Sequence, residues 1–204
     1  MIRTFLKNII YILFSKFIIR VGPADSIYLT FDDGPHPVYT GRIIEILSRY
    51  SITSTFFMTG IEMLKYPNIV FMVKNSGHRI AFHGYTHTSM KKQTLNEFIS
   101  DMKHVSKLES MFGIKLNLYR PPYGDLTLSG FLYLAMNRWK IVMWSLDSKD
   151  SFDTEEKVIE TVSCIHVKLG DILLFHDDYE LTARSLDTIL TNYQNAGFKL
   201  NIIL

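Results

Sequence analysis

Short apolar runs alternate along the chain with longer segments in which apolar residues recur at helical spacing. An apolar run rich in β-branched and aromatic residues predicts a strand, whereas a spacing of three and four residues predicts an amphipathic helix. The predicted strands are 27–31, 53–59, 79–82, 116–119, 141–146, 172–175 and 198–204. The predicted helices are 41–50, 68–75, 94–112, 126–138, 154–169 and 181–196.

Capping residues support these boundaries. The helix 94–112 opens with Thr94 and Glu97 in the Ser/Thr-x-x-Glu capping pattern, and Gly113 follows its end. Gly197 likewise follows the last predicted helix. About seven alternations of strand and helix predict a parallel sheet, either open and doubly wound or closed into a barrel. No linker or internal repeat interrupts the pattern, so we expect one domain.

Composition narrows the class of protein. The 204 residues are 47% hydrophobic and 21% charged, which excludes intrinsic disorder, a collagen-like repeat and a multi-span membrane protein. The net charge of +2 gives no basic face of the kind that binds nucleic acid. The single cysteine, Cys164, permits no internal disulfide.

The first 24 residues differ from the rest, because they hold four of the 22 basic residues and none of the 20 acidic ones. Their uninterrupted apolar run, 9–14, is far shorter than the ~20 residues that span a bilayer. Polar residues recur at helical period over 3–20, which predicts a basic amphipathic segment, 1–22, ahead of one domain, 23–204. The segment could lie on a membrane surface, pack on its own domain or serve as an atypical export signal or anchor.

Polar residues that could take part in catalysis or metal binding follow five predicted strands directly. They are Asp32-Asp33-Gly34-Pro35, His83 with His87, Arg120-Pro121-Pro122-Tyr123-Gly124, Asp147 with Asp150, and His176. The carboxyl ends of parallel strands share one face, where active sites sit, so these groups are expected to converge. The spacing of His83 and His87 is that of metal ligands, and two imidazoles with one carboxylate leave coordination positions open for water and substrate.

These motifs resemble those of the polysaccharide deacetylases of the NodB-homology type, carbohydrate esterase family 4. The resemblance spans about residues 26–204, with TFDDGP, HGYTH, RPPYG, DSKD and LFH in the family order. It implies an α/β fold, an irregular (β/α) barrel. It also implies a metal-dependent hydrolase that removes N-acetyl groups from N-acetylglucosamine-containing glycans (peptidoglycan, chitooligosaccharide or exopolysaccharide) and releases acetate.

The resemblance assigns the metal site and the base. Asp33, His83 and His87 would bind a divalent metal, with zinc expected and cobalt, nickel or manganese as alternatives. Asp32 would be the general base, and Arg120 would hold it in position, a task that suits the guanidinium fork. A cation on Asp33 would offset the repulsion between the adjacent carboxylates and help to keep Asp32 ionised.

The resemblance also assigns the remaining catalytic roles. The backbone N–H of Tyr123 would stabilise the oxyanion of the tetrahedral intermediate. His176 would protonate the departing nitrogen, with Asp150 orienting its ring. Leu174 would line the pocket for the acetyl methyl group.

The chain departs from the family pattern after Asp150. The family usually has an aromatic residue there, often Trp, whereas this chain has Ser151 and then Phe152. Either Phe152 takes over by a one-residue shift, or the acetyl pocket is more open. The expected substrate contacts are thus Leu174, Phe152 and Tyr123.

The positions next to the first and fifth motifs carry weaker expectations. Asp177 and Asp178 are expected on a solvated loop, and His36 is expected near the edge of the cleft at most.

Three other functions share part of this pattern. O-acetyl ester hydrolysis on a xylan-like polysaccharide would use the same site. A phosphohydrolase with Asp32 as nucleophile would normally show an Asp-x-Asp spacing, which is absent. An inactive glycan-binding relative would be favoured only if the base or the acid were missing.

The same hypothesis sets the expected partners and location. They are an acetylated glycan and, through residues 1–20, a membrane surface, with no nucleic acid. We expect a monomer that acts on bacterial envelope glycans near a membrane.

Overall fold

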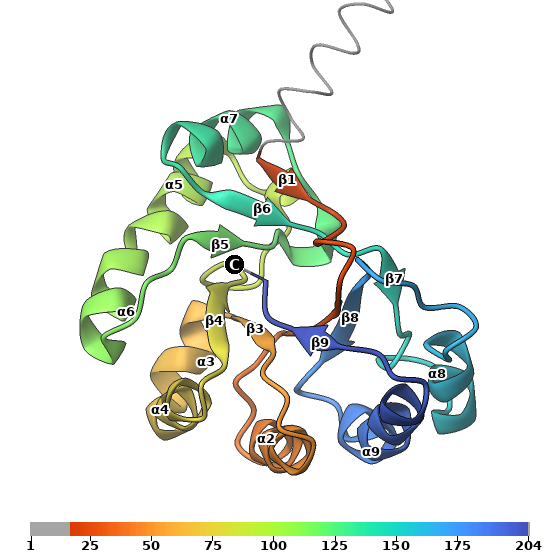
Figure 1. Cartoon of the computed structure of the whole chain (residues 1–204). Helices are drawn as coiled ribbons and strands as arrows, with labels where there is room; N and C mark the ends of the chain where they lie inside the picture. The colour runs from red at the N-terminus through yellow and green to blue at the C-terminus, as the bar shows by residue number, and fades with distance from the viewer. Residues whose placement is uncertain (1–16, 204) are drawn as a thin grey trace, which may run out of the picture.

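Parallel strands form a curled sheet with helices around its outside in the computed structural model, which describes residues 17–203 (Figure 1). The hydrogen-bonded path runs β1-β6-β5-β4-β3-β2-β8-β7, with β9 also paired to β2. The strands are β1 (Ile18–Ile19), β2 (Ile27–Asp32), β3 (Thr55–Met58), β4 (Arg79–Phe82), β5 (Leu118–Tyr119), β6 (Lys140–Val142), β7 (Leu146–Asp147), β8 (Ile172–His176) and β9 (Leu200–Asn201). All pairings between these strands are parallel.

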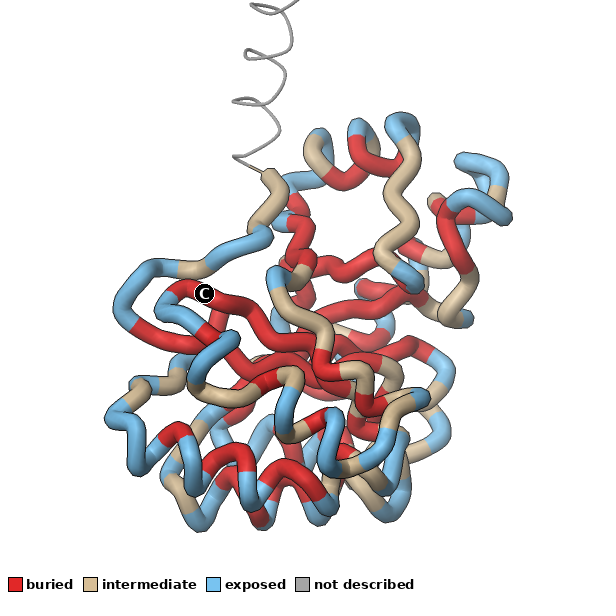
Figure 2. The backbone as a smooth tube through the Cα atoms, turned by 90° about the vertical axis from the view of Figure 1, so that its right-hand side faces the viewer, coloured by how far each residue is buried: buried red, intermediate tan, exposed pale blue. Residues whose placement is uncertain are grey.

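The helices follow the strands in alternation. They are α2 (Tyr39–Arg49), α3 (Gly60–Lys65), α4 (Pro67–Asn75), α5 (Leu95–Lys103), α6 (Val105–Phe112), α7 (Leu128–Met136), α8 (Glu155–Thr161) and α9 (Glu180–Asn195), with 3₁₀ turns at Met90–Lys92 and Pro122–Gly124. Figure 2 shows the buried residues concentrated in the strands and on the inner faces of the helices.

Neighbouring residues along a strand face two different apolar layers, as the period of two in a strand requires. On β3, Phe56 packs in the layer between the sheet and the helices, whereas Phe57 packs in the smaller layer on the opposite face. On β2, Leu29 and Tyr28 divide in the same way. The sheet is therefore buried on both faces, which explains its nearly continuous apolar strands.

The sheet curls toward closure. Strands β6 and β7 lie near opposite ends of the hydrogen-bonded path, although only residues 143–145 separate them. Four Cα-to-Cα steps reach at most about 14 Å, so the two ends of the path must lie close together. The Gly22 N–H donates to the Gly170 carbonyl (2.8 Å), which ties the chain after β1 to the start of β8. This arrangement confirms the expected irregular (β/α) barrel.

One predicted strand is wrong as a single element. The segment 141–146 has the continuous apolar character of one buried strand, but it divides into β6 and β7, which pair with different neighbours. Met143, Trp144 and Ser145 carry the chain across the opening of the barrel.

The amino-terminal prediction also needs correction. Residues 18 and 19 fall within the stretch predicted to have a helical period, but they form β1 on the edge of β6. The Ile141 N–H donates to the Phe17 carbonyl (2.7 Å) and the Met143 N–H to the Ile19 carbonyl (2.8 Å). An unpaired strand edge satisfies its backbone groups in this way, so the sheet begins before the predicted boundary at 23. The rest of the predicted segment, 1–16, lies outside the described residues.

The helix predictions hold in part. The helix 94–112 has its capping box, but it is divided into α5 and α6 at His104, whose N–H bonds the Asp101 carbonyl three residues back. Helix α3 was missed because Gly60, expected to stop a strand, begins a helix. Helix α8 ends at Thr161, well before the predicted end at 169. Within the described range, no helix combines the length and the apolar character needed to cross a bilayer.

Candidate metal centre and active site

The sequence motifs converge at the carboxyl ends of four parallel strands. Asp32 ends β2 and lies beside His176 at the end of β8. His83 follows β4, and Arg120 follows β5, whose Tyr119 pairs with Phe82. Parallel pairing alone brings these ends to one face, so the expected convergence is observed.

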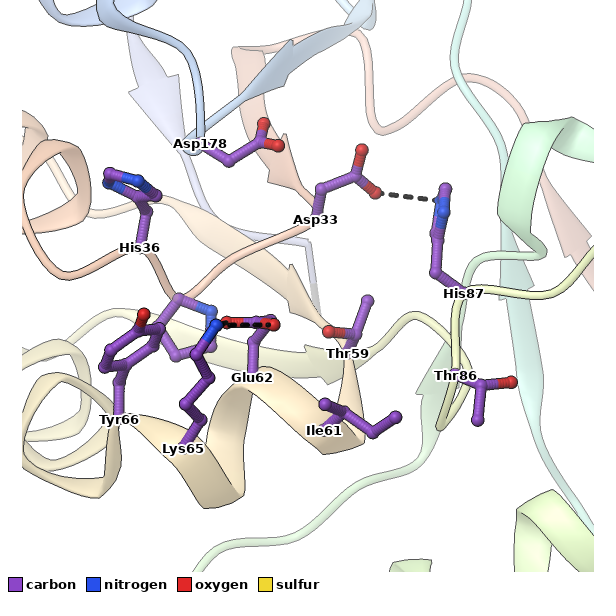
Figure 3. A pocket seen from close by; sticks show the side chains of 11 residues that line it. Asp33, His36, Thr59, Ile61, Glu62, Lys65, Tyr66, Thr86, His87 and Asp178 are labelled. Carbon is purple, nitrogen blue, oxygen red and sulfur yellow. Dashed lines mark hydrogen bonds and ion pairs between the residues drawn. The ribbon is translucent and has the colours of Figure 1, made fainter.

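Asp33, His83 and His87 form a compact cluster. Asp33 Oδ1 lies 3.2 Å from His83 Nε2 and 3.0 Å from His87 Nε2, the second contact being drawn in Figure 3. The three candidate ligand atoms all lie within 4.8 Å of one another. Asp33 and His87 both adopt positive φ values (76° and 55°), a conformation that costs roughly 1 kcal/mol or more for such residues. This strained backbone conformation places the two side chains in the cluster.

The atoms facing one another in this cluster are arranged for a cation. His83 Nδ1 lies 2.8 Å from the Arg120 carbonyl, which can only accept, so Nδ1 carries the proton. In the neutral ring, Nε2 then directs its lone pair toward Asp33 Oδ1, a buried oxygen with no hydrogen-bond donor in the described residues. Burial lowers the pKa of His83, but the charges of Asp32 and Asp33 and the hydrogen bond to the Arg120 carbonyl outweigh it and raise the pKa. Two imidazoles and one carboxylate fit zinc or another divalent ion of similar ligand preference.

Asp32 is buried and held by a fully buried guanidinium. Arg120 Nη1 donates to Asp32 Oδ1 (2.6 Å) and to Thr30 Oγ1 (2.8 Å). Its Nε donates to the Val142 carbonyl (3.1 Å) and its Nη2 to the Met143 carbonyl (3.2 Å). These contacts satisfy the buried charge on several sides and fix the direction of the Asp32 carboxylate.

His176 is paired with a buried carboxylate on the other side of Asp32. Its Nδ1 donates to Asp150 Oδ1 (2.7 Å), while Asp150 Oδ2 accepts from the His176 N–H (2.7 Å) and from Thr182 Oγ1 (2.5 Å). Burial alone lowers the pKa of His176, but the hydrogen bond and charge of Asp150, with the charges of Asp32 and Asp33, raise it to about 9. His176 is therefore mostly protonated at neutral pH.

The loop after β5 presents a backbone donor. Pro121 and Pro122 lead into a 3₁₀ turn in which Tyr123 has a φ of 60°. The Tyr123 N–H donates no hydrogen bond within residues 17–203, so it is free for a ligand. The Tyr123 ring is 67% exposed and lies 4.7 Å from the His87 ring, centroid to centroid.

A cavity of about 270 Å³, here called the reaction cavity, joins the predicted groups. Its walls are Asp32, Asp33, His83, His87, Pro121, Tyr123, Trp144, Asp147, Ser151, Leu174, His176 and Tyr179. Leu174, expected in the acetyl pocket, is one of these walls. Arg120 and Asp150 lie behind them, in contact with Asp32 and His176.

The expected role of Phe152 is not supported. Phe152 is 70% exposed and lies outside the walls of the reaction cavity, with the Lys149 ammonium 5.5 Å from its ring centroid. Ser151 lines the cavity instead, so no one-residue shift restores an aromatic at that position. Trp144 and Tyr179 are the wall aromatics that the sequence analysis missed. Trp144 lies within 141–146, which was predicted to be one continuous strand.

The two carboxylates after His176 were also misjudged. Asp177 is fully buried, accepts from the Gly34 N–H (3.0 Å) and Thr40 Oγ1 (2.5 Å), and has its pKa raised to about 7 by burial. A Cβ on Gly34 would lie 2.1 Å from Asp177 Oδ2, so only glycine fits this turn. Burial, with the charge of Asp33, raises the pKa of Asp178 to about 6. Asp177 is thus not solvated, whereas Asp178 lies half-buried in the turn that follows β8.

A second cavity, of about 540 Å³, lies against α3 and is here called the α3 cavity (Figure 3). It shares Asp33 and His87 with the reaction cavity, so these two side chains stand between the cavities. Its other walls are Pro35, His36, Thr59, Ile61, Glu62, Lys65, Tyr66, Thr86 and Asp178. His36, expected at most at the cleft edge, is one of them.

Comparison with known proteins gives a consistent match. Residues 20–135 match the family model described as polysaccharide deacetylase. A peptidoglycan-N-acetylglucosamine deacetylase of Bacillus cereus is 29% identical over 178 residues, covering 85% of this chain and 84% of the relative. The peptidoglycan-N-acetylglucosamine deacetylase PgdA of Listeria monocytogenes is 29% identical over 174 residues and 85% of this chain. This chain spans only 37% of the length of PgdA.

Solved structures share the fold. The Bc1960 peptidoglycan N-acetylglucosamine deacetylase superposes with a TM-score of 0.87 at 25% identity, covering 95% of this chain and 94% of that chain. A family 4 carbohydrate esterase from Streptomyces lividans, solved with acetate, gives a TM-score of 0.80 at 25% identity, covering 88% and 92%.

Removing the Arg120 guanidinium should destabilise the fold, because the buried Asp32 charge then has no partner. We expect Arg120→Met to lower the free energy of unfolding by about 3–5 kcal/mol, because Asp32 is left buried without its partner. The double variant Asp32→Asn/Arg120→Met should recover part of this loss, as measured by urea unfolding. Equal stability of the single and double variants would contradict the electrostatic account.

Proposed function

The chain belongs to the polysaccharide deacetylase family, and from this premise we propose that it removes N-acetyl groups from N-acetylglucosamine-containing glycans and releases acetate. The observation that carries the proposal is that Asp32, His176 and the cluster Asp33, His83 and His87, the candidates for base, acid and metal ligands, line one cavity. The relatives' names, which include peptidoglycan and chitooligosaccharide deacetylases, support an acetylated glycan as the substrate.

The proposed reaction uses this chain's residues in sequence. Held by Asp33, His83 and His87, a divalent metal would polarise the acetyl carbonyl and lower the pKa of water. Asp32, fixed by Arg120, accepts a proton from the water that attacks the acetyl carbon.

The later steps fall to two groups on the opposite walls. The Tyr123 N–H donates to the carbonyl oxygen as negative charge develops there, a contact worth ~3–4 kcal/mol in other acyl-transfer sites. Protonated His176, kept in orientation by Asp150, gives its proton to the amide nitrogen as the bond to the acetyl carbon breaks. The products are acetate and a free amino sugar.

The charge state of His176 favours amide over ester hydrolysis. An amine is a poor leaving group unless its nitrogen is protonated, whereas an alcohol depends less on an acid. A His176 pKa of about 9 keeps the proton available at neutral pH. Hydrolysis of O-acetyl esters on a xylan-like polysaccharide is therefore the second candidate, and an inactive glycan-binding role is disfavoured because base and acid are both in place.

We further propose that the protein works as a monomer at a membrane surface, through its basic amino-terminal segment. Phe17, at the start of the described chain, packs edge-to-face on Phe131 of α7 (6.2 Å). On α7, Leu128, Leu132 and Met136 recur every four residues, and each is at least half exposed. An apolar stripe close to Phe17, the residue that the basic residues 1–16 precede in the chain, suits the surface of an anionic bilayer.

Acetate release should require both the metal and Asp32. We expect the protein to release acetate from N-acetylglucosamine oligomers, to lose activity with a chelator, and to regain it with zinc. Asp32→Asn should reduce kcat by at least about 100-fold, because general-base catalysis typically contributes 10²–10⁴-fold. Full recovery with cobalt, nickel or manganese but not with zinc would show that zinc is not the metal the enzyme uses. Release from acetylated xylan alone would establish the esterase.

Deacetylation should fall as the pH rises through the His176 pKa. The acid must be protonated, so activity is retained below about pH 9 and is lost above it. Asp150→Asn removes the partner that raises this pKa and should move the alkaline limb of the kcat profile to lower pH. Asp153→Asn, on a residue outside the reaction cavity, is the control. An unmoved limb in Asp150→Asn would rule out His176 as the titrating acid.

Membrane contact is testable by truncation. The deletion should end at residue 16, because residues 18 and 19 belong to the sheet. We expect the protein lacking residues 1–16 to bind anionic liposomes at least about tenfold more weakly than the full chain, with zwitterionic liposomes as the control. Equal partitioning of both proteins in a flotation assay would dismiss the membrane proposal.

A further inference from the structure

The α3 cavity opens directly beside the metal ligands, on the side away from His176. Asp33 and His87 line both cavities, whereas Leu174 and His176 line only the reaction cavity. A substrate whose acetyl group occupies the reaction cavity can therefore extend past these two side chains into the α3 cavity. At about 540 Å³ the α3 cavity falls within the range of small-molecule sites.

One wall of the cavity offers a hydrogen-bond acceptor without a donor. Asp178 Oδ1 is fully shielded from solvent and has no hydrogen-bond partner among the described residues. Figure 3 shows the Asp178 carboxylate on the same side of the cavity as Asp33. Asp178 as a whole is half-buried and lines the cavity, so its carboxylate can accept from a ligand hydroxyl there, whereas a ligand carboxylate would leave two negative charges facing each other.

Another part of the wall offers a neutral donor and an aromatic ring. His36 Nδ1 accepts from the Tyr39 N–H (3.2 Å), so the proton of the neutral ring lies on Nε2. The His36 ring stacks on Tyr39, with centroids 4.5 Å apart, which fixes its direction. The half-buried Tyr66 ring lies on the same side (Figure 3).

The cavity has no unpaired side-chain cation for a ligand carboxylate among its described walls. The Lys65 ammonium lies 3.4 Å from Glu62 Oε2 and 4.9 Å from the Tyr66 ring centroid. His36 has a pKa lowered by burial and stays neutral. A further cation would be the proposed metal ion held by Asp33, His83 and His87, whose charge the Asp33 carboxylate partly balances.

We propose that the α3 cavity binds the sugar residue next to the reacting one, and that Asp178 selects an uncharged, hydroxyl-bearing sugar over one that carries a carboxylate. This inference rests on the proposed function, since it needs a glycan whose acetyl group lies in the reaction cavity. Hydroxyls of the neighbouring sugar donate to Asp178, His36 Nε2 donates to a sugar oxygen, and Tyr66 contacts an apolar edge of the ring. The preferred substrate is thus a run of neutral hexosamines, and a muramic-type neighbour is disfavoured unless its carboxylate is blocked.

The test compares two ligands that differ only in charge. Peptidoglycan tetrasaccharides with free lactyl carboxylates and the same tetrasaccharides with those groups converted to carboxamides are assayed for acetate release. The wild-type holoenzyme should prefer the carboxamide form by about tenfold or more in kcat/KM, since hydrogen bonds and repulsion at a charged group have that size. Asp178→Asn should reduce this preference to about threefold or less, mainly through KM.

Two references separate binding from chemistry. 4-Nitrophenyl acetate is too small to reach the α3 cavity from the reaction cavity, so Asp178→Asn should affect it much less than the tetrasaccharides. Asp153→Asn, a carboxylate on neither cavity, should keep the wild-type preference. Tyr66→Leu should weaken both tetrasaccharides without changing the ratio between them.

The outcomes are distinguishable from failure of the proposed function. A wild-type preference near one, or a preference that survives in Asp178→Asn, would overturn the inference even if deacetylation is observed. Without any deacetylation, NMR titration of the zinc-loaded protein with the same two tetrasaccharides decides the matter. Tighter binding of the carboxamide form that is lost in Asp178→Asn would support the α3 cavity although the proposed activity had failed, and equal binding would overturn it.

Discussion

The fully buried ion pair between Arg120 and Asp32 is the contact on which the site depends. Arg120 reaches from the end of β5 to Asp32 on β2, and it also donates to the carbonyls of Val142 and Met143. The guanidinium lies 4.1 Å from the Phe57 ring centroid, inside the curled sheet. A charge in this position is tolerated only because its donors find acceptors, so the strands that supply them are held in one arrangement.

The negative charges of the site follow from the same arrangement. Asp32 and Asp33 are adjacent in sequence, but Asp32 faces Arg120 and Asp33 faces the two histidines. One carboxylate is thus balanced by a permanent cation of the protein, and the other is left for a metal ion. This division would allow the neighbouring carboxylates to act as the proposed base and metal ligand without sharing one proton.

The buried turn behind the site has a structural role. Asp177 holds Gly34 and Thr40 through its carboxylate, and this fixes the loop from which Asp33 projects. Asp178, the next residue, faces the α3 cavity instead. Two consecutive carboxylates therefore lie in different surroundings, one buried inside the fold and one on a cavity wall, and nothing in their sequence distinguishes them.

The sequence by itself determined the order of strands and helices and the parallel sheet, because turn residues and local spacing carry that information. The family resemblance of its motifs pointed to Asp33, His83 and His87 as the proposed metal ligands. Strands β2, β4 and β8 match their predicted ranges within one residue. Only the tertiary structure decided that 141–146 crosses the barrel opening, that β1 completes the edge of β6, and that Trp144 rather than Phe152 faces the reaction cavity. These features depend on which segment pairs with an unpaired strand edge and which side chain covers a cavity wall. Contacts between residues far apart in the chain determine both.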